Sequence, residues 1–291
     1  MINIQAIVKN KYARLTRIHS LTGVFLIASP CWLGVAIAFE STKQYLYWNL
    51  MFTIGALIMR PACCIINDLC DINIDGKVER TKKRPLAAKE INKIEACTLA
   101  AVLLFIGLLV FLKLNQLSQI IAMIGFLLSC IYPLSKRFMK LPEIFLGFTI
   151  SIGVLVGFTA VTNKITPMSL AMYCACSMWQ AGIGAIYGQQ DAKDDKIIGV
   201  NSAATKITES FEKFIYNLYS MFLLTVILLG IAMKLNYIFY LSCIIVAYML
   251  YVQALCTNLK SSKECAKSFK MSPIIAIILS IGFYIGKIYK K

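Results

Sequence analysis

Hydrophobic residues form long runs separated by short polar breaks along the whole chain. A helix that crosses the hydrocarbon core of a bilayer needs about 20 apolar residues, and nine runs approach or exceed that length. They lie at 18–39, 45–66, 92–112, 117–134, 142–163, 167–188, 212–233, 236–256 and 271–289. The pattern therefore predicts an all-α polytopic membrane protein of about nine transmembrane helices.

Composition agrees with lipid as the solvent of this chain. Hydrophobic residues make up 59% of it and the mean hydropathy is +0.72, whereas soluble domains are about 45–50% apolar. No linker or low-complexity tract interrupts the pattern, so we expect one transmembrane domain spanning residues 1–291.

The chain has a net charge of +16, and its basic residues lie mostly in the segments between the apolar runs. This placement is explained by the orientation of a membrane protein and by contact with lipid head groups. That arrangement argues against a nucleic-acid partner. Lys and Arg concentrate in the N-terminal arm and in loops 67–91, 135–141, 189–211 and 257–270, while the intervening loops hold about one each. The alternation predicts that the N-terminus and both acid-bearing loops are cytoplasmic. Nine spans would then leave the C-terminus outside, and three lysines at that end run mildly against this: Lys287, Lys290 and Lys291.

The first apolar run follows a basic arm and lacks an A-x-A cleavage site, so it is predicted to be a membrane helix and not a cleaved signal. The arm is also a poor transit peptide. We therefore expect the chain in a bacterial inner membrane.

Carboxylates gather at two places on the predicted cytoplasmic side. Asn67, Asp71 and Asp75 are four residues apart, and at about 100° per residue they share one helical face. The second set, Tyr187, Asp191 and Asp195, repeats this spacing. Such stripes would repel unless a cation lay between them, and Mg²⁺ is commonly held by carboxylates together with substrate phosphates. The spacing predicts a Mg²⁺ site.

Basic residues follow the first acid cluster and the fourth apolar run. They are Arg80, Arg84, Lys136 and Arg137. Arginine makes bidentate, charge-assisted bonds to phosphate. Carboxylates and arginines at the mouth of a lipid-facing cavity suit a diphosphate with an apolar tail. Positive-inside topology alone is the simpler explanation for Lys82, Lys83 and Lys140.

Three motifs resemble those of the UbiA superfamily of intramembrane prenyltransferases. Segment 67–75 reads NDLCDINID and is followed by RTKKRPL at 80–86, similar to NDxxDxxxD…RTxxRPL. Segment 132–137 reads YPLSKR, similar to YPxxKR of the hydroxybenzoate branch. Segment 187–195 reads YGQQDAKDD and is followed by GVNS at 199–202, similar to YAxQDxxDDxxxGVKS.

The resemblance implies an all-helical fold around a cavity open to lipid. It also implies Mg²⁺-dependent transfer of a polyprenyl group, in ubiquinone biosynthesis, from its diphosphate to the carbon ortho to the hydroxyl of 4-hydroxybenzoate. The metal ligands would be Asn67, Asp71, Asp75, Asp191 and Asp195, supported by Asp68 and Asp194. Residues contacting substrate would be Arg17, Arg80, Arg84, Lys136, Arg137 and Tyr187, and those nearest the chemistry Asp71, Asp191, Arg80 and Lys136.

The sequence departs from the family pattern at three places. His19 and Leu21 replace the acid and proline of RxDKPxG, although Arg17 and Gly23 remain. Gly184 and Ala185 replace an Asp-Thr pair, and Asn201 replaces the lysine of GVKS. These changes bear on the acceptor more than on the reaction class.

Several alternatives remain open from the sequence. Within the superfamily, the acceptor could be a naphthoate, a related quinone precursor or haem, although the haem branch lacks the pattern seen at 190–195. A membrane transporter is a rival from another class, but the acids lie at one face and not at the midplane. The eleven cysteines form no CxxC pair and there is one histidine, so a zinc site or a histidine-based triad is not expected.

Overall fold

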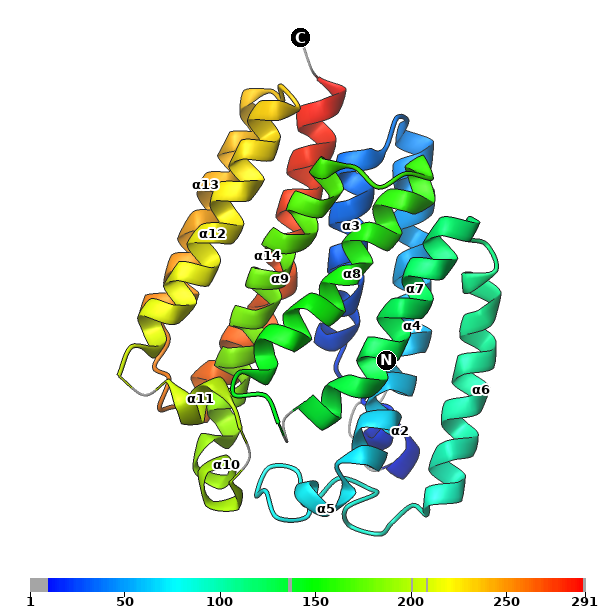
Figure 1. Ribbon diagram of the computed structural model, residues 1–291, viewed down its shortest axis with the longest axis vertical. Helices are drawn as coiled ribbons and strands as arrows, with labels where there is room; N and C mark the ends of the chain where they lie inside the picture. The colour runs from blue at the N-terminus through cyan, green and yellow to red at the C-terminus, as the bar shows by residue number, and fades with distance from the viewer. Residues whose placement is uncertain (1–9, 136–137, 200, 208, 290–291) are drawn as a thin grey trace.

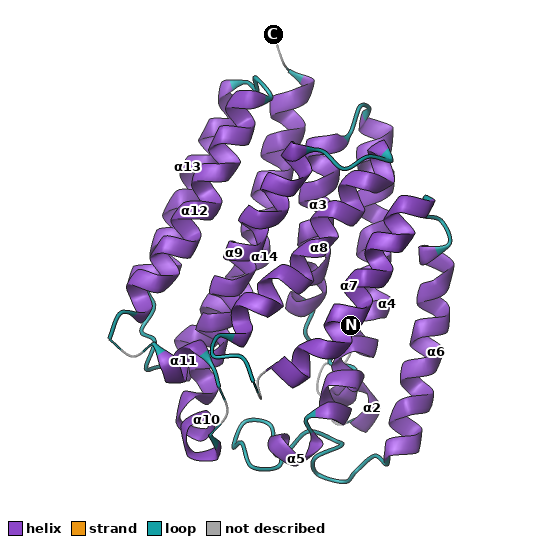
Figure 2. Ribbon diagram, in the orientation of Figure 1, coloured by secondary structure: helices purple, strands orange, loops and turns teal. Residues whose placement is uncertain are grey.

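The computed structural model describes residues 10–135, 138–199, 201–207 and 209–289, and the elements within these residues are helices (Figures 1 and 2). The long ones are α3 (Thr22–Ala38), α4 (Thr42–Cys70), α6 (Lys93–Phe111), α7 (Gln116–Ser135), α8 (Pro142–Thr162), α9 (Pro167–Gly188), α12 (Phe211–Ala232), α13 (Tyr237–Tyr251) and α14 (Ser262–Ile288). Shorter elements are α2 (Lys11–Leu15), α5 (Ile72–Asp75), the 3₁₀ turn η1 (Gln189–Asp191), α10 (Ala192–Ile198), α11 (Ala203–Lys206) and the π-helical turn η2 (Val252–Cys256).

Each predicted apolar run contains one long helix of the described chain, and the all-α prediction is confirmed. Seven of these helices, α13 being taken together with η2, are long and apolar enough to cross a membrane. The other two are α3, a shorter apolar helix of 17 residues, and α9. The predicted number of nine spans is therefore not confirmed by length and composition.

The last helix begins well before its predicted start at 271. Ser261 is its N-cap and accepts a hydrogen bond from the Glu264 backbone N–H, so the helix starts at Ser262. Capping residues satisfy the otherwise unpaired N–H groups of a first turn. The polar first two turns of α14 thus extend the helix beyond its apolar stretch.

The helices form a closed bundle because the last helix, α14, packs against the first long helix, α3. Helix α14 packs on α3, which also packs on α4 and α8, while α8 lies between α7 and α9 (Figure 1). Small residues bring α3 and α8 close together. A Cβ added at Gly34 would lie 2.1 Å from the Val154 carbonyl oxygen, and one at Gly157 would lie 2.3 Å from that of Cys31. Close backbone approach through small residues is typical of helices packed in membranes.

Large apolar side chains cover the outside of the bundle. Examples are Phe105 and Leu109 on α6, Ile124 on α7, Leu228 on α12 and Ile244 on α13, all exposed. Exposed apolar surface of this extent is unfavourable in water and suits lipid. The chain is a multi-pass membrane protein.

Both acid-bearing loops lie at the same end of the bundle. In Figure 1 the elements α5, α10 and α11 are at the lower end, whereas α14 ends at the opposite one. The two loops also touch, because the backbone N–H of Glu79 donates to Asp194 Oδ2 at 2.9 Å.

Candidate active site

A cavity of about 1070 Å³ opens between the acid-bearing loops and runs into the bundle. Helices α3 to α9 supply most of its wall, and Phe269 contributes from α14. Asn67, Asp71, Asp75, Asp191 and Asp195 all line it, as do Arg17, Arg80, Arg84 and Tyr187.

Apolar side chains line the inner part of the cavity. Leu104, Leu108 and Phe111 repeat on one face of α6 up to the end of that helix, and Ile152 and Val156 do so on α8. At 1.5 Å per residue, Leu104 and Phe111 are about 10 Å apart along the helix axis. The cavity thus joins a charged mouth to a long apolar interior.

The first acid cluster keeps its helical spacing although α4 ends at Cys70. The Asp71 N–H donates to the Asn67 carbonyl at 2.9 Å, and the Asp75 N–H donates to the Asp71 carbonyl at 2.8 Å. These i to i+4 bonds continue the helical repeat across the break before α5. Asp71 and Asp75 are 3% and 6% exposed, and burial of carboxylates requires compensating partners.

Arginines compensate part of this charge. Arg84 donates to Asp68 Oδ1 at 3.0 Å and to Asp75 Oδ2 at 2.7 Å, and Arg17 also pairs with Asp68. Asp68 is 2% exposed and is held by these two arginines. Its observed partners are thus cations of the protein itself.

The residues of the second acid cluster do not lie on one continuous α-helix, although their spacing is that of a helix. Helix α9 ends at Gly188, the 3₁₀ turn η1 follows, and α10 carries Asp194 and Asp195. Tyr187, Asp191 and Asp195 nevertheless all reach the cavity. The tighter 3₁₀ turn changes the angle between successive side chains, so tertiary placement and not one helical face gathers them.

Arg80 connects the two clusters. Its Nε donates to Asp191 Oδ1 at 2.7 Å, a second guanidinium nitrogen pairs with Asp191 Oδ2, and a third donates to the Tyr187 hydroxyl at 3.0 Å. The guanidinium also lies 5.1 Å from the centre of the Tyr187 ring. Burial works against its charge, but the bonds to Asp191 and the neighbouring Tyr187 outweigh burial, and the pKa of Arg80 lies above its ordinary value. Arg80 therefore stays protonated.

The arginines occupy the space between the acids. Within the described part of the chain, no three His, Cys, Asp or Glu side chains are close enough together to hold a metal ion. The donor chemistry still fits Mg²⁺, because several buried carboxylates and the Asn67 amide face one cavity. Lys136 and Arg137 fall outside the described residues.

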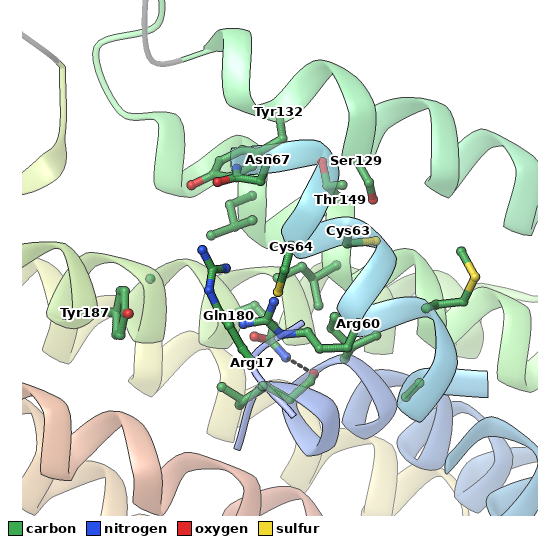
Figure 3. A pocket seen from close by; sticks show the side chains of 18 of the residues that line it. Arg17, Arg60, Cys63, Cys64, Asn67, Ser129, Tyr132, Thr149, Gln180 and Tyr187 are labelled. Carbon is green, nitrogen blue, oxygen red and sulfur yellow. Dashed lines mark hydrogen bonds between the residues drawn. The ribbon is translucent and has the colours of Figure 1, made fainter. Parts of the chain in front are cut away.

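Arg60 is a cavity residue that the sequence motifs missed. It lies on α4 and points into the cavity with Arg17, as Figure 3 shows. A Cβ added at Gly23 would lie 2.3 Å from its Nε, so the guanidinium packs directly against the bare backbone of α3 at this glycine. Among the described residues no carboxylate pairs with Arg60. An isolated arginine in an apolar run is a functional signal in membrane proteins and could have identified it.

Gln180 is a second missed residue. Pro30 has no N–H, so the Leu26 carbonyl on α3 lacks its helical donor. The Gln180 side-chain nitrogen donates to that carbonyl at 3.2 Å (Figure 3). The Ser29 hydroxyl donates to the same carbonyl at 2.9 Å. These bonds fix the Gln180 amide on the cavity wall.

The three departures from the family pattern all fall on this cavity. His19, Gly184 and Asn201 line it. A Cβ added at Gly184 would lie 3.3 Å from Leu146 Cδ2 and 3.7 and 3.8 Å from the Cβ and Cγ of Glu143, so α9 packs closely against α8 here. The cavity wall therefore differs at these three positions from the family pattern.

Comparison with known proteins agrees with the fold and the motifs. The model of the UbiA prenyltransferase family matches residues 27–275. The chain is 32% identical to the mitochondrial 4-hydroxybenzoate polyprenyltransferase of Aedes aegypti over 99% of its own length and 66% of that protein. It is 30% identical to the 4-hydroxybenzoate octaprenyltransferase of Coxiella burnetii over 97% of its own length and 98% of that protein.

Solved structures share the fold. A UbiA homolog from Aeropyrum pernix has a TM-score of 0.76 and 21% identity, covering 90% of this chain and 97% of the homolog. A UbiA homolog from Archaeoglobus fulgidus bound to DMAPP and Mg²⁺ has a TM-score of 0.70 and 18% identity, covering 96% of this chain and all of that one. Together, the family match and the relatives establish that this chain belongs to the UbiA prenyltransferase family.

Proposed function

We propose that this protein is a Mg²⁺-dependent 4-hydroxybenzoate polyprenyltransferase of ubiquinone biosynthesis, acting in a bacterial inner membrane with its acid-bearing loops cytoplasmic. The observation that carries the proposal is the single cavity in which carboxylates and arginines at the mouth adjoin an apolar interior. A diphosphate matches the mouth and a polyprenyl tail matches the interior. The relatives named above as 4-hydroxybenzoate prenyltransferases support the choice of acceptor.

The metal would be held by Asn67, Asp71, Asp75, Asp191 and Asp195, with Asp68 and Asp194 nearby, and would neutralise charge on the departing diphosphate. Arg80 and Arg84 already lie among these acids. When the diphosphate binds, their guanidinium groups can turn from carboxylate to phosphate oxygens, for which arginine has the same bidentate geometry. Lys136 and Arg137 would add positive charge.

In the reaction, the allylic C–O bond breaks and leaves a delocalised cation on the prenyl chain. The phenol ring attacks through the carbon ortho to its hydroxyl, forming the C–C bond, and loss of the ring proton restores aromaticity. Water would quench the cation, and the apolar lining of Leu104, Leu108 and Phe111 keeps it out.

We assign the acceptor carboxylate to Arg60. This guanidinium lies in the cavity, has no carboxylate partner among the described residues, and sits on a helix amid apolar neighbours. A hydrogen bond to a charged partner is worth about 1.5–3 kcal/mol, and Arg17 is engaged with Asp68. Arg60 is thus better suited than Arg17, which the sequence had suggested.

Product analysis tests the proposal. Membranes containing the protein are incubated with Mg²⁺, a medium-chain allylic diphosphate and 4-hydroxybenzoate, with and without EDTA. We expect a prenylated hydroxybenzoate that disappears with EDTA. Prenylation of a naphthoate or haem, and not of 4-hydroxybenzoate, by inserted and folded protein would reject the proposed acceptor.

A further inference from the structure

Glu143 is a buried carboxylate on the cavity wall that the motifs did not single out. It lies in the first turn of α8 and is 6% exposed. Its two oxygens accept the backbone N–H of Ala203 at 2.9 and 3.0 Å. Burying a carboxylate is costly, so this contact, made 60 residues away in the sequence, indicates a defined role.

The partner of Glu143, Ala203, is the first residue of α11. Gly199 ends α10 with a φ of 77°, a conformation that favours glycine. Ser202 then caps α11, and its own N–H donates to Thr205 Oγ1 at 3.1 Å. Asn201 and Ser202 both line the cavity, as Asp195 does. Glu143 therefore ties the segment that carries Asn201 and Ser202 to α8.

Helix α9 leaves room for this carboxylate. Gly184 and Gly188 are four residues apart and share a helical face. A Cβ at Gly184 would lie 3.7 Å from Glu143 Cβ, and one at Gly188 would lie 3.5 Å from Glu143 Oε1. A longer side chain at position 184 would compete for the same space. The family pattern has an acid at position 184, where this chain has glycine. The facing helix α8 carries an acid, Glu143, beside that position.

We propose that Glu143 is a positioning residue that holds the Asn201–Ser202 wall against the diphosphate end of the cavity and so sets the affinity for the prenyl diphosphate. This proposal rests on the proposed function, because it requires the cavity to bind a prenyl diphosphate. It assigns Glu143 no contact with substrate. Its effect passes through the hydrogen bonds to Ala203.

Binding and hydrogen exchange together test the proposal on the purified full-length protein. The probe is geranylgeranyl S-thiolodiphosphate, an unreactive analogue, added with Mg²⁺ and measured by calorimetry. Hydrogen exchange of the peptide covering 199–206 includes the Ala203 amide. Glu143→Ala should bind the analogue about ten-fold more weakly and exchange this peptide faster, because a charge-assisted bond is lost. The KM for the aromatic acceptor should change by less than about two-fold.

Two further variants make the outcome decisive. Glu143→Gln keeps the size and one acceptor oxygen, so it guards against a folding defect; we expect binding weakened by about three-fold and faster exchange. Glu212→Gln, an exposed acid in the first turn of α12, is the matched control and should change neither. Unchanged exchange in both Glu143 variants, or unchanged analogue affinity with faster exchange, would overturn the proposal. If the wild-type protein did not bind the analogue at all, the proposed function would fail, while the exchange data would still test the contact.

Discussion

Arg80 and Asp191, 111 residues apart in the sequence, form a two-point ion pair across the mouth of the cavity. The pair neutralises one carboxylate of the second acid cluster and connects it to the loop after the first. Because guanidinium binds phosphate with the same planar fork, Arg80 can pass from Asp191 to an incoming diphosphate. The charge of Asp191 is thus already balanced by Arg80.

Replacing Arg80 with Lys should lower kcat/KM for the allylic diphosphate by about ten- to a hundred-fold. Lysine keeps the charge but loses the bidentate geometry and the bond to Tyr187. Steady-state kinetics with varied diphosphate measure the effect. Lys82→Ala is the control, since Lys82 is exposed and pairs with exposed Glu79; an equal loss in both variants would mean that general surface charge matters instead.

Removing a carboxylate from either cluster should abolish turnover without unfolding the protein. We expect Asp71→Ala and Asp191→Ala to lose at least about a hundred-fold in kcat, the scale on which catalytic electrostatic groups act. Product formation is measured beside a thermal melt in detergent. Glu40→Gln, an exposed acid between α3 and α4, should behave as wild type. Substantial activity in either well-folded Asp variant would show that the metal site is assigned wrongly.

Chelation should remove activity reversibly. The acids at the mouth form an oxygen-rich donor set that suits a hard divalent ion, so EDTA should stop product formation and excess Mg²⁺ should restore it. Mg²⁺ added with the unreactive diphosphate analogue should also raise the melting temperature, because a ligand that binds only the folded state stabilises it. Full activity in EDTA would exclude metal dependence.

Arg60→Leu should raise the KM for 4-hydroxybenzoate by about ten- to a hundred-fold and leave the KM for the diphosphate nearly unchanged. The reason is loss of a hydrogen-bonded charge pair worth about 1.5–3 kcal/mol. The methyl ester of 4-hydroxybenzoate lacks the negative charge and serves as the internal control. If ester and acid lost equally, Arg60 would not bind the carboxylate.

Gly184→Asp should destabilise the folded protein, because it adds a second carboxylate close to Glu143. The Cβ of the new side chain would lie 3.7 Å from the Glu143 Cβ, and neighbouring carboxylates repel each other. Combining it with Glu143→Gln should recover most of the lost stability, since only one negative charge then remains. A double-mutant cycle from thermal or denaturant melts gives the coupling, which for residues in contact is about 0.5–3 kcal/mol. Strictly additive effects would mean that positions 143 and 184 do not share the same space.

The sequence by itself determined the membrane-spanning architecture and the two acid clusters. Runs of apolar residues require helices in lipid, since every backbone polar group must be paired within the segment. The spacing of Asn67, Asp71 and Asp75 is local, and the helical repeat carries it into the structure. The 3₁₀ turn Gln189–Asp191 interrupts the α-helical repeat of the second cluster, so spacing alone does not fix how Asp191 and Asp195 are placed.

Only the tertiary structure decided which charges meet. The pairing of Arg80 with Asp191, the seating of Arg60 against Gly23, and the bonds from Ala203 to Glu143 join residues far apart in the chain. Side-chain periodicity fixes the face on which a residue lies but carries no information about the partner helix. That choice depends on how α3, α4, α8 and α9 pack, and close packing of small residues against neighbouring backbones determines it.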